Sequence, residues 1–107
     1  MLMSTMAHML ARLRGSRIED VRSVLHTDAT KHAEQGLHLE YLWQNVDEPE
    51  EVLFLFRIDN PTLAKKFIER VHKEAIKQDP TVNLPLMTYL EEDTDRKPRK
   101  KLERTKG

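Results

Sequence analysis

Residues 37–59 read LHLEYLWQNVDEPEEVLFLFRID, and this stretch decides the fold. Two segments in which apolar and polar residues alternate flank the turn-forming cluster Asp47-Glu48-Pro49-Glu50. Alternation with a period of two predicts a β-strand, and two such segments around a short polar turn predict a β-hairpin. We therefore expect the residues on either side of this turn to pair as antiparallel strands.

A register that pairs Val46 with Glu51 gives the two faces of the hairpin different characters. One face then carries the pairs Leu39–Ile58, Tyr41–Phe56 and Trp43–Phe54. The opposite face carries the pairs Leu42–Leu55, Glu40–Arg57 and His38–Asp59. Opposite charges across a ladder stabilise it by roughly 0.2–1 kcal/mol per pair, and a slip of one residue would exchange the two faces. This register predicts that the aromatic row faces the core.

The segments before the hairpin predict a strand and a helix. Residues 6–14 suit a strand, and Gly15 ends it. Ser16 and Glu19 have the spacing of a capping box, and Gly36 suits a helix stop. The apolar residues between them recur at helical spacing: Ile18, Val21, Leu25, Ala29, His32 and Ala33.

The segments after the hairpin predict a second helix and a last strand. Asn60 suits the N-cap and Pro61 the first helical position, while Asp79-Pro80 ends the helix. Its expected inner face consists of Ala64, Phe67, Ile68, Val71 and Ala75. Residues 84–91 then suit an edge strand, because Pro85 cannot donate to a ladder.

The element order β-α-β-β-α-β predicts an α+β, ferredoxin-like fold, in which a four-stranded antiparallel sheet carries both helices on one face. The other face would then expose the apolar side chains of Leu42, Leu53 and Leu55. Monomeric proteins rarely leave a large apolar patch in water. We therefore expect a homodimer whose sheets pack through these three leucines.

Composition divides the 107-residue chain into a body and a basic tail. We expect a disordered N-terminus at 1–5, one domain at 6–92 and a disordered tail at 93–107. The net charge is zero, but seven basic residues and one acidic residue follow Asp95, so the body before them is acidic. An acidic body does not suit nucleic-acid binding. The chain has no cysteine and no apolar stretch that could span a bilayer, which favours a cytoplasmic protein.

The run from Trp43 to Val52, WQNVDEPEEV, together with Leu55-Phe56, Asp59 and Tyr89-Leu90-Glu91-Glu92, resembles the dimeric α+β-barrel superfamily. The closest likeness is to uncharacterised small proteins near its antibiotic-biosynthesis monooxygenase-like branch. The resemblance covers about residues 6–92 and implies a dimeric α+β barrel. It is specific for the fold and the hairpin turn, and it does not assign an activity.

Candidate chemistry concentrates on polar residues of the hairpin. A carboxylate beside an imidazole orients it and suits a general base, so His38 and Asp59 are the candidate catalytic pair. The alternative is a structural pair that fixes the register. Glu40 and Arg57 would offer polar contacts to a ligand beside them.

The aromatic residues Tyr41, Trp43, Phe54 and Phe56 either form core or line an apolar ligand cavity between sheet and helices. Histidines 26, 32 and 72 lie on or beside the helical stripes and suit packing. Their spacing does not form a metal motif, so we expect neither a metal nor a cofactor. The chain has three glycines and no phosphate-binding loop.

Together these features favour a small ligand-binding or stress-associated protein without a demonstrable active site. Two alternatives stay open. One is a cofactor-independent enzyme, monooxygenase-like or cyclase-like, that acts on a small hydrophobic compound. The other is a protein-interaction module whose basic tail recruits an acidic partner.

Overall fold

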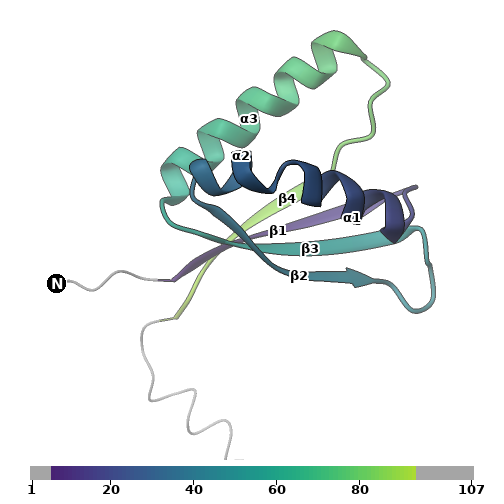
Figure 1. Ribbon diagram of the computed structural model, residues 1–107, viewed down its shortest axis with the longest axis horizontal. Coiled ribbons are helices and arrows are strands. Elements are labelled where there is room, and N and C mark those ends of the chain that lie inside the picture. Colours follow the sequence, from purple (N-terminus) through teal and green to yellow (C-terminus); the bar gives the residue numbers. More distant parts are fainter. Residues whose placement is uncertain (1–5, 94–107) are drawn as a thin grey trace, which may run out of the picture.

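Four strands form one antiparallel sheet in the order β2-β3-β1-β4 in the computed structural model, which describes residues 6–93. All the helices lie on one face of this sheet (Figure 1). The elements in chain order are β1 (Ala7–Arg14), α1 (Ile18–Thr27), α2 (Ala29–Glu34), β2 (Leu37–Gln44), β3 (Glu51–Ile58), α3 (Pro61–Gln78) and β4 (Leu86–Glu91). The predicted ferredoxin-like α+β fold is confirmed.

The predicted segments at the two ends fall largely beyond this description. The N-terminus at 1–5 and the tail at 94–107 lie outside the described residues. No helix within residues 6–93 combines the length and apolar character that crossing a bilayer requires.

The first predicted helix is split in two at Asp28. This residue ends α1 and begins α2, with φ −94° and ψ 8°. The predicted capping box is wrong, because the N-cap is Arg17 and no side chain caps this end. The backbone N–H groups of Gly15 and Ser16 instead donate to the carbonyl of Glu50, at 2.8 and 3.2 Å. Ser16 is thereby held to the hairpin turn, and the helix begins after it.

The second predicted helix begins as expected, and its far half is more exposed than expected. The Asn60 side chain accepts a hydrogen bond from the Leu63 N–H at 3.1 Å, and Pro61 occupies the first helical position. Ala64, Phe67 and Ile68 are buried, whereas Val71, predicted on the inner face, is 42% exposed. Figure 1 shows the reason: α3 starts beside the sheet and diverges from it toward Gln78.

The hairpin forms, but the predicted register is wrong. Leu39 pairs with Phe56 and Tyr41 with Leu55, so a β-bulge at Glu40 interrupts the alternation. Leu42 therefore pairs with Phe54, and Trp43 pairs with Leu53. An extra residue in one strand turns all the following side chains to the opposite face. Tyr41 and Trp43 consequently lie on the helix-free face, and Leu42 packs against the core.

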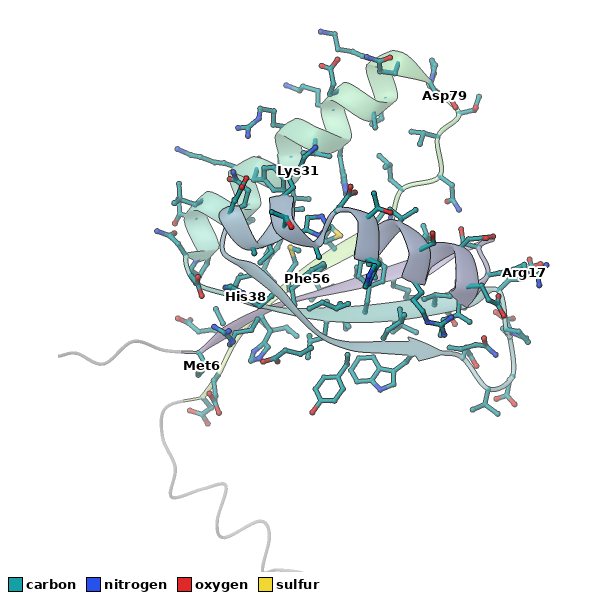
Figure 2. The ribbon with its side chains drawn as sticks, in the orientation of Figure 1. Met6, Arg17, Lys31, His38, Phe56 and Asp79 are labelled. Carbon is teal, nitrogen blue, oxygen red and sulfur yellow. The ribbon has the colours of Figure 1, made fainter. Side chains whose placement is uncertain are left out.

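The core lies between the sheet and the helices and is built from alternate residues of the central strands. Figure 2 shows Phe56 on this side of the sheet, beneath α2. The most deeply buried large side chains are Met9, Leu37 and Val52. Because of the bulge, Leu42 enters this layer in place of Tyr41 and Trp43. This arrangement avoids a cost, since a buried Tyr hydroxyl or Trp N–H needs a hydrogen-bond partner and a leucine side chain does not.

Candidate functional site

The sheet and helices create two regions that could bind another molecule. The first is the sheet face opposite the helices, which we call the open face. The second is a cavity between the sheet, α1, α2 and α3, which we call the helix-side cavity.

The ladder arranges the open face in rows that run across the strands. His38, Arg57, His8 and Leu90 form a mostly polar row at one end. The next two rows are mostly apolar and contain Tyr41, Leu55, Leu10, Thr88, Trp43, Leu53, Arg12 and Leu86. Arg14 and Glu51 pair at the other end. The open face is therefore an apolar band between two charged margins.

Two aromatic residues stand at one side of this band. The rings of Tyr41 and Trp43 are stacked, with centroids 5.1 Å apart and an interplanar angle of 6°. They remain 55% and 44% exposed, respectively. About half of each side chain is therefore open to contact with a partner.

The polar margin contains the candidate catalytic pair. The Nε2 atom of His38 lies 3.0 Å from Oδ2 of Asp59, at hydrogen-bonding distance. Arg57 contacts both Asp59, at 3.2 Å, and Glu40, at 3.5 Å. Glu40 also reaches His8 on β1, at 3.3 Å. The predicted contacts His38–Asp59 and Glu40–Arg57 thus exist although the register differs, and His8 joins them.

The contacts in this margin favour the ionised form of the Asp59 side chain. The hydrogen bond with His38 lowers the pKa of Asp59; desolvation opposes this shift, and the electrostatic interactions with His38 and Arg57 reinforce it. The backbone of Asp59 is also tied to the turn before β2, because its N–H donates to the carbonyl of Gly36 at 3.0 Å. Gly36 has φ +76°, and a Cβ there would approach the Asp59 side chain to 3.2 Å. A glycine at this turn therefore leaves room for the His38–Asp59 pair.

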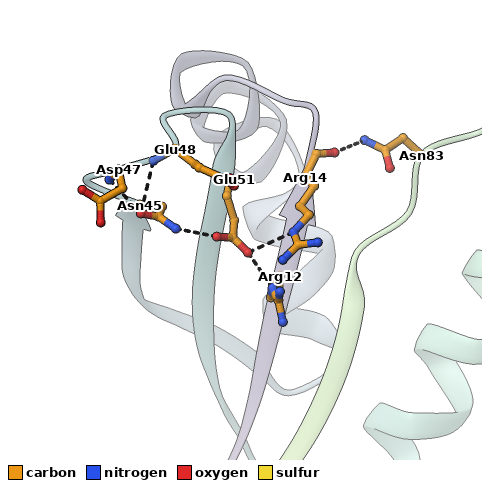
Figure 3. Close-up of polar contacts among 7 residues, drawn as sticks. All are labelled: Arg12, Arg14, Asn45, Asp47, Glu48, Glu51 and Asn83. Carbon is orange, nitrogen blue, oxygen red and sulfur yellow. Dashed lines mark hydrogen bonds and ion pairs between the residues drawn. The ribbon is translucent and has the colours of Figure 1, made fainter.

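The other margin is a clamp built around Glu51 (Figure 3). This side chain is buried, and Asn45 donates to it at 2.6 Å. Arg12 and Arg14 on β1 donate to its second oxygen, at 2.6 and 3.2 Å. Asn45 also accepts hydrogen bonds from the backbone N–H groups of the turn residues Asp47 and Glu48. The Asn and Glu of the hairpin motif thus hold the turn and join it to β1.

The clamp predicts how stability responds to acid. The hydrogen bonds from Asn45 and Arg12 lower the pKa of Glu51 from 4.5 to about 2. A carboxylate with a depressed folded-state pKa stabilises the fold above its unfolded value and loses this contribution as the pH falls through the folded value. We expect Glu51→Gln to reduce the loss of stability between about pH 4.5 and pH 2. Urea unfolding across this range measures it.

Glu50→Gln is the matched control for this prediction. Glu50 is the exposed neighbour of Glu51 in the same turn. Its replacement should leave the acid dependence as steep as in the unmodified protein. An equal flattening by both substitutions would contradict the assignment of this effect to the clamp.

The helix-side cavity has a volume of about 410 Å³. The cavity exists because α3 diverges from the sheet and leaves it incompletely covered. Residues of the sheet and of all three helices form its walls. Most of its lining is apolar, and includes Met9, Leu13, Val21, Leu25, Phe54, Phe56, Phe67, Ile68, Val71 and Met87. Ligand cavities of this size with few polar groups are typical of small-molecule sites.

A few polar side chains also border the cavity. They are His32, His72, Asn83, Asp20, Asp28 and Lys31. Burial lowers the pKa of His32, an effect opposed by Asp28 and reinforced by Lys31. Burial also lowers the pKa of His72. The ring of His32 contacts Phe56 edge-on, with centroids 5.3 Å apart. Burial therefore favours the neutral form of both imidazoles.

The predicted ligand residues are divided between the two regions. Phe54 and Phe56 line the helix-side cavity, whereas Tyr41, Trp43, Glu40 and Arg57 lie on the open face. His38 and Asp59 do not line this cavity. His38 borders a smaller hollow of about 290 Å³ over β2, together with Leu42 and Phe56 but without Asp59. The candidate pair and the aromatic residues of the core thus do not share one cleft.

The predicted dimer residues are divided as well. Leu53 and Leu55 lie on the open face, where they alternate with the buried residues of β3. Leu42 was expected beside them, and that placement is wrong because of the bulge at Glu40. Sequence patterns did not identify Asn83 or Asp20 as cavity residues, since neither lies in a motif.

Within residues 6–93, no group of three or more histidine, aspartate and glutamate side chains is arranged to hold a metal ion. Many of the polar side chains of the open face are instead paired with one another in its two margins.

No family model matches the chain. A thymidylate kinase from Coprothermobacter proteolyticus is 39% identical to it over 66 residues, which is 62% of this chain. The match covers 32% of that kinase, so the chain spans about a third of the length of this relative.

Proposed function

We propose that the protein binds a small, largely apolar molecule in the helix-side cavity. The observation that carries this proposal is the cavity itself, which three phenylalanines and several aliphatic side chains line. Fully buried apolar side chains usually pack against one another without large voids. This cavity of about 410 Å³ opens to solvent and leaves the apolar layer partly unpacked, and its volume falls within the range of small-molecule sites.

The polar residues support a ligand with a hydrogen-bonding group. The imidazoles of His32 and His72 offer a donor and an acceptor without a full charge, and Asn83, whose amide nitrogen donates to the Arg14 carbonyl, adds its amide oxygen as an acceptor. Val24 and Val71 are 58% and 42% exposed and line the same cavity, so they mark its opening to solvent. A ligand can therefore enter between α1 and α3.

A second candidate function is a cofactor-independent enzyme that acts on such a ligand. Two neutral imidazoles that border an apolar cavity favour it, since a neutral imidazole can accept a proton from a bound substrate. His38 and Asp59 do not line the cavity and are not assigned this role. We do not propose nucleotide phosphorylation, because the chain has only Gly15, Gly36 and Gly107 and lacks a phosphate-binding loop.

We also propose that the open face binds a second copy of the chain. Its apolar band is bordered by charged margins of both signs, which suits a self-complementary contact. The exposed Tyr41–Trp43 stack belongs to the residue types that dominate protein interfaces. Interaction through the predicted basic tail is a separate prediction on residues outside the described range.

Titration with 2-naphthol, followed by nuclear magnetic resonance, tests ligand binding. We expect shifts at the cavity residues Phe54, Phe67 and Met87, while the indole N–H of Trp43 on the open face stays unchanged. Val71→Trp should fill the opening of the cavity and weaken binding by about tenfold or more, because the added ring occupies the ligand's volume.

Ile76→Trp is the matched control for this substitution. Ile76 is 49% exposed on the same helix and does not line the cavity. Its replacement should leave the affinity for 2-naphthol unchanged. Shifts confined to the open face, or an equal loss in both variants, would contradict the proposal. If 2-naphthol binds in the cavity, mass spectrometry of small molecules that co-purify with the protein is the way to identify the natural ligand.

A further inference from the structure

We infer that the helix-side cavity selects uncharged ligands and releases them when its two histidines become protonated. This inference rests on the proposed function, because it concerns the regulation of the same site. It depends on where charges lie around the cavity.

The fixed charges at the cavity are mostly negative. Asp20 and Asp28 border it from α1 and from the junction with α2, and Lys31 borders it from α2. With neutral imidazoles, these groups leave one net negative charge on the lining. An anionic ligand would enter against this charge and would also lose water in an apolar site, which is costly without a partner. An uncharged ligand meets neither cost.

The two histidines belong to different elements of the cavity wall. His32 lies on α2, and His72 lies on α3. Their burial among apolar groups disfavours the imidazolium form. The charged groups nearest His32 are Asp28 and Lys31, and Arg22, His26 and His38 border the smaller hollow that His32 also lines. His72 also borders the outer groove of α3, with Glu69, Arg70 and Lys73. Lys66 borders the same groove, which therefore carries three cationic side chains and one carboxylate.

Protonation would reverse the charge of the lining. Two imidazolium groups convert one net negative charge into one net positive charge. Because both pKa values lie below the ordinary 6.5, this change occurs below pH 6.5. A bound apolar ligand covers the imidazoles and competes with their hydration, so proton binding and ligand binding oppose each other. The linkage is reciprocal, and acid therefore favours release.

Two probes of the same shape and different charge test the inference. 2-Naphthol is uncharged from about pH 7.5 to pH 5, whereas 2-naphthoate is an anion. At about pH 7.5 we expect 2-naphthol to bind at least about tenfold more tightly than 2-naphthoate. On lowering the pH to about 5, we expect the affinity for 2-naphthol to fall by about tenfold and that for 2-naphthoate to rise.

Histidine variants locate the effect. The double variant His32→Asn, His72→Asn should bring the ratio of the 2-naphthol affinities at the two pH values close to one. His26→Asn is the control, because His26 is exposed on α1 and does not line the cavity. It should keep the full pH dependence. The amide spectrum at each pH checks that each variant is folded.

The outcomes separate this inference from the function on which it rests. If 2-naphthol binds in the cavity and 2-naphthoate binds equally well, or if the affinity for 2-naphthol is the same at both pH values, charge selection is overturned and ligand binding stands. A pH dependence that survives in the double histidine variant also overturns the inference. If neither probe binds in the cavity, the proposed function fails together with it.

Discussion

Leu55→Glu is expected to abolish the proposed dimer. Leu55 lies on the central strand β3, in the apolar band of the open face. A second copy packed on this band would enclose the new carboxylate without a partner, which costs several kcal/mol. We expect the dissociation constant of the dimer to rise by at least about a hundredfold. Analytical ultracentrifugation over a range of protein concentrations measures it.

Leu63→Glu is the control for this change. Leu63 is 58% exposed near the start of α3, on the helix side of the molecule. A glutamate there lies three residues after the N-cap, where it suits a helix. The dimer should persist in this variant. A protein that is already monomeric at micromolar concentration, or a dimer that survives Leu55→Glu, would show that the open face is not the interface.

Phe56→Ala is expected to cause the largest loss of folding stability. The side chain is 3% exposed and contacts both Phe54 and His32 through its ring. Truncation of a buried phenylalanine removes its burial and leaves a cavity, at a cost of about 3–5 kcal/mol. The monomeric Leu55→Glu background is suitable for the measurement, since association then adds nothing to the unfolding free energy. Chemical denaturation in that background gives the value.

Tyr41→Ala is the comparison that also tests the bulge. Tyr41 is 55% exposed on the open face, so its truncation in the same monomeric background should cost less than about 1 kcal/mol. Without the bulge, the ladder that pairs Leu39 with Phe56 would place Tyr41 opposite Phe54, on the core side of the sheet. Similar large losses for both substitutions would therefore contradict the observed pairing.

The order of elements could be predicted because each one depends on local signals. Asn60-Pro61 begins α3 through a side-chain hydrogen bond and a fixed φ, and these effects need no distant partner. The turn between β2 and β3 was likewise evident from its residues. The bulge at Glu40 was not evident from the sequence, because alternating residues fit a regular strand pairing as well as a pairing with one extra residue. Only packing against the helices favours Leu42 over Trp43 on the inner side.

The candidate site could be predicted only in part, for a similar reason. The His38–Asp59 contact joins the start of β2 to the residue that follows β3. A hairpin brings these two positions together even when the register differs by a residue or two. The helix-side cavity depends instead on the angle of α3, which follows from how Phe67 and Ile68 pack near its start while Val71 does not. No periodicity encodes that angle. Asn83 reaches the cavity from an irregular loop, so its position needed the structure.

The outward turn of Trp43 gives this protein an optical property that its core does not share. Trp43 is the sole tryptophan of the chain, and it is 44% exposed beside Tyr41. Its fluorescence will therefore respond first to whatever shields that surface from water, with a shift toward shorter wavelength on coverage. A denaturation curve recorded from this emission alone would combine two processes, dissociation of a partner from the open face and unfolding of the core. Circular dichroism, which reports unfolding, should therefore accompany it.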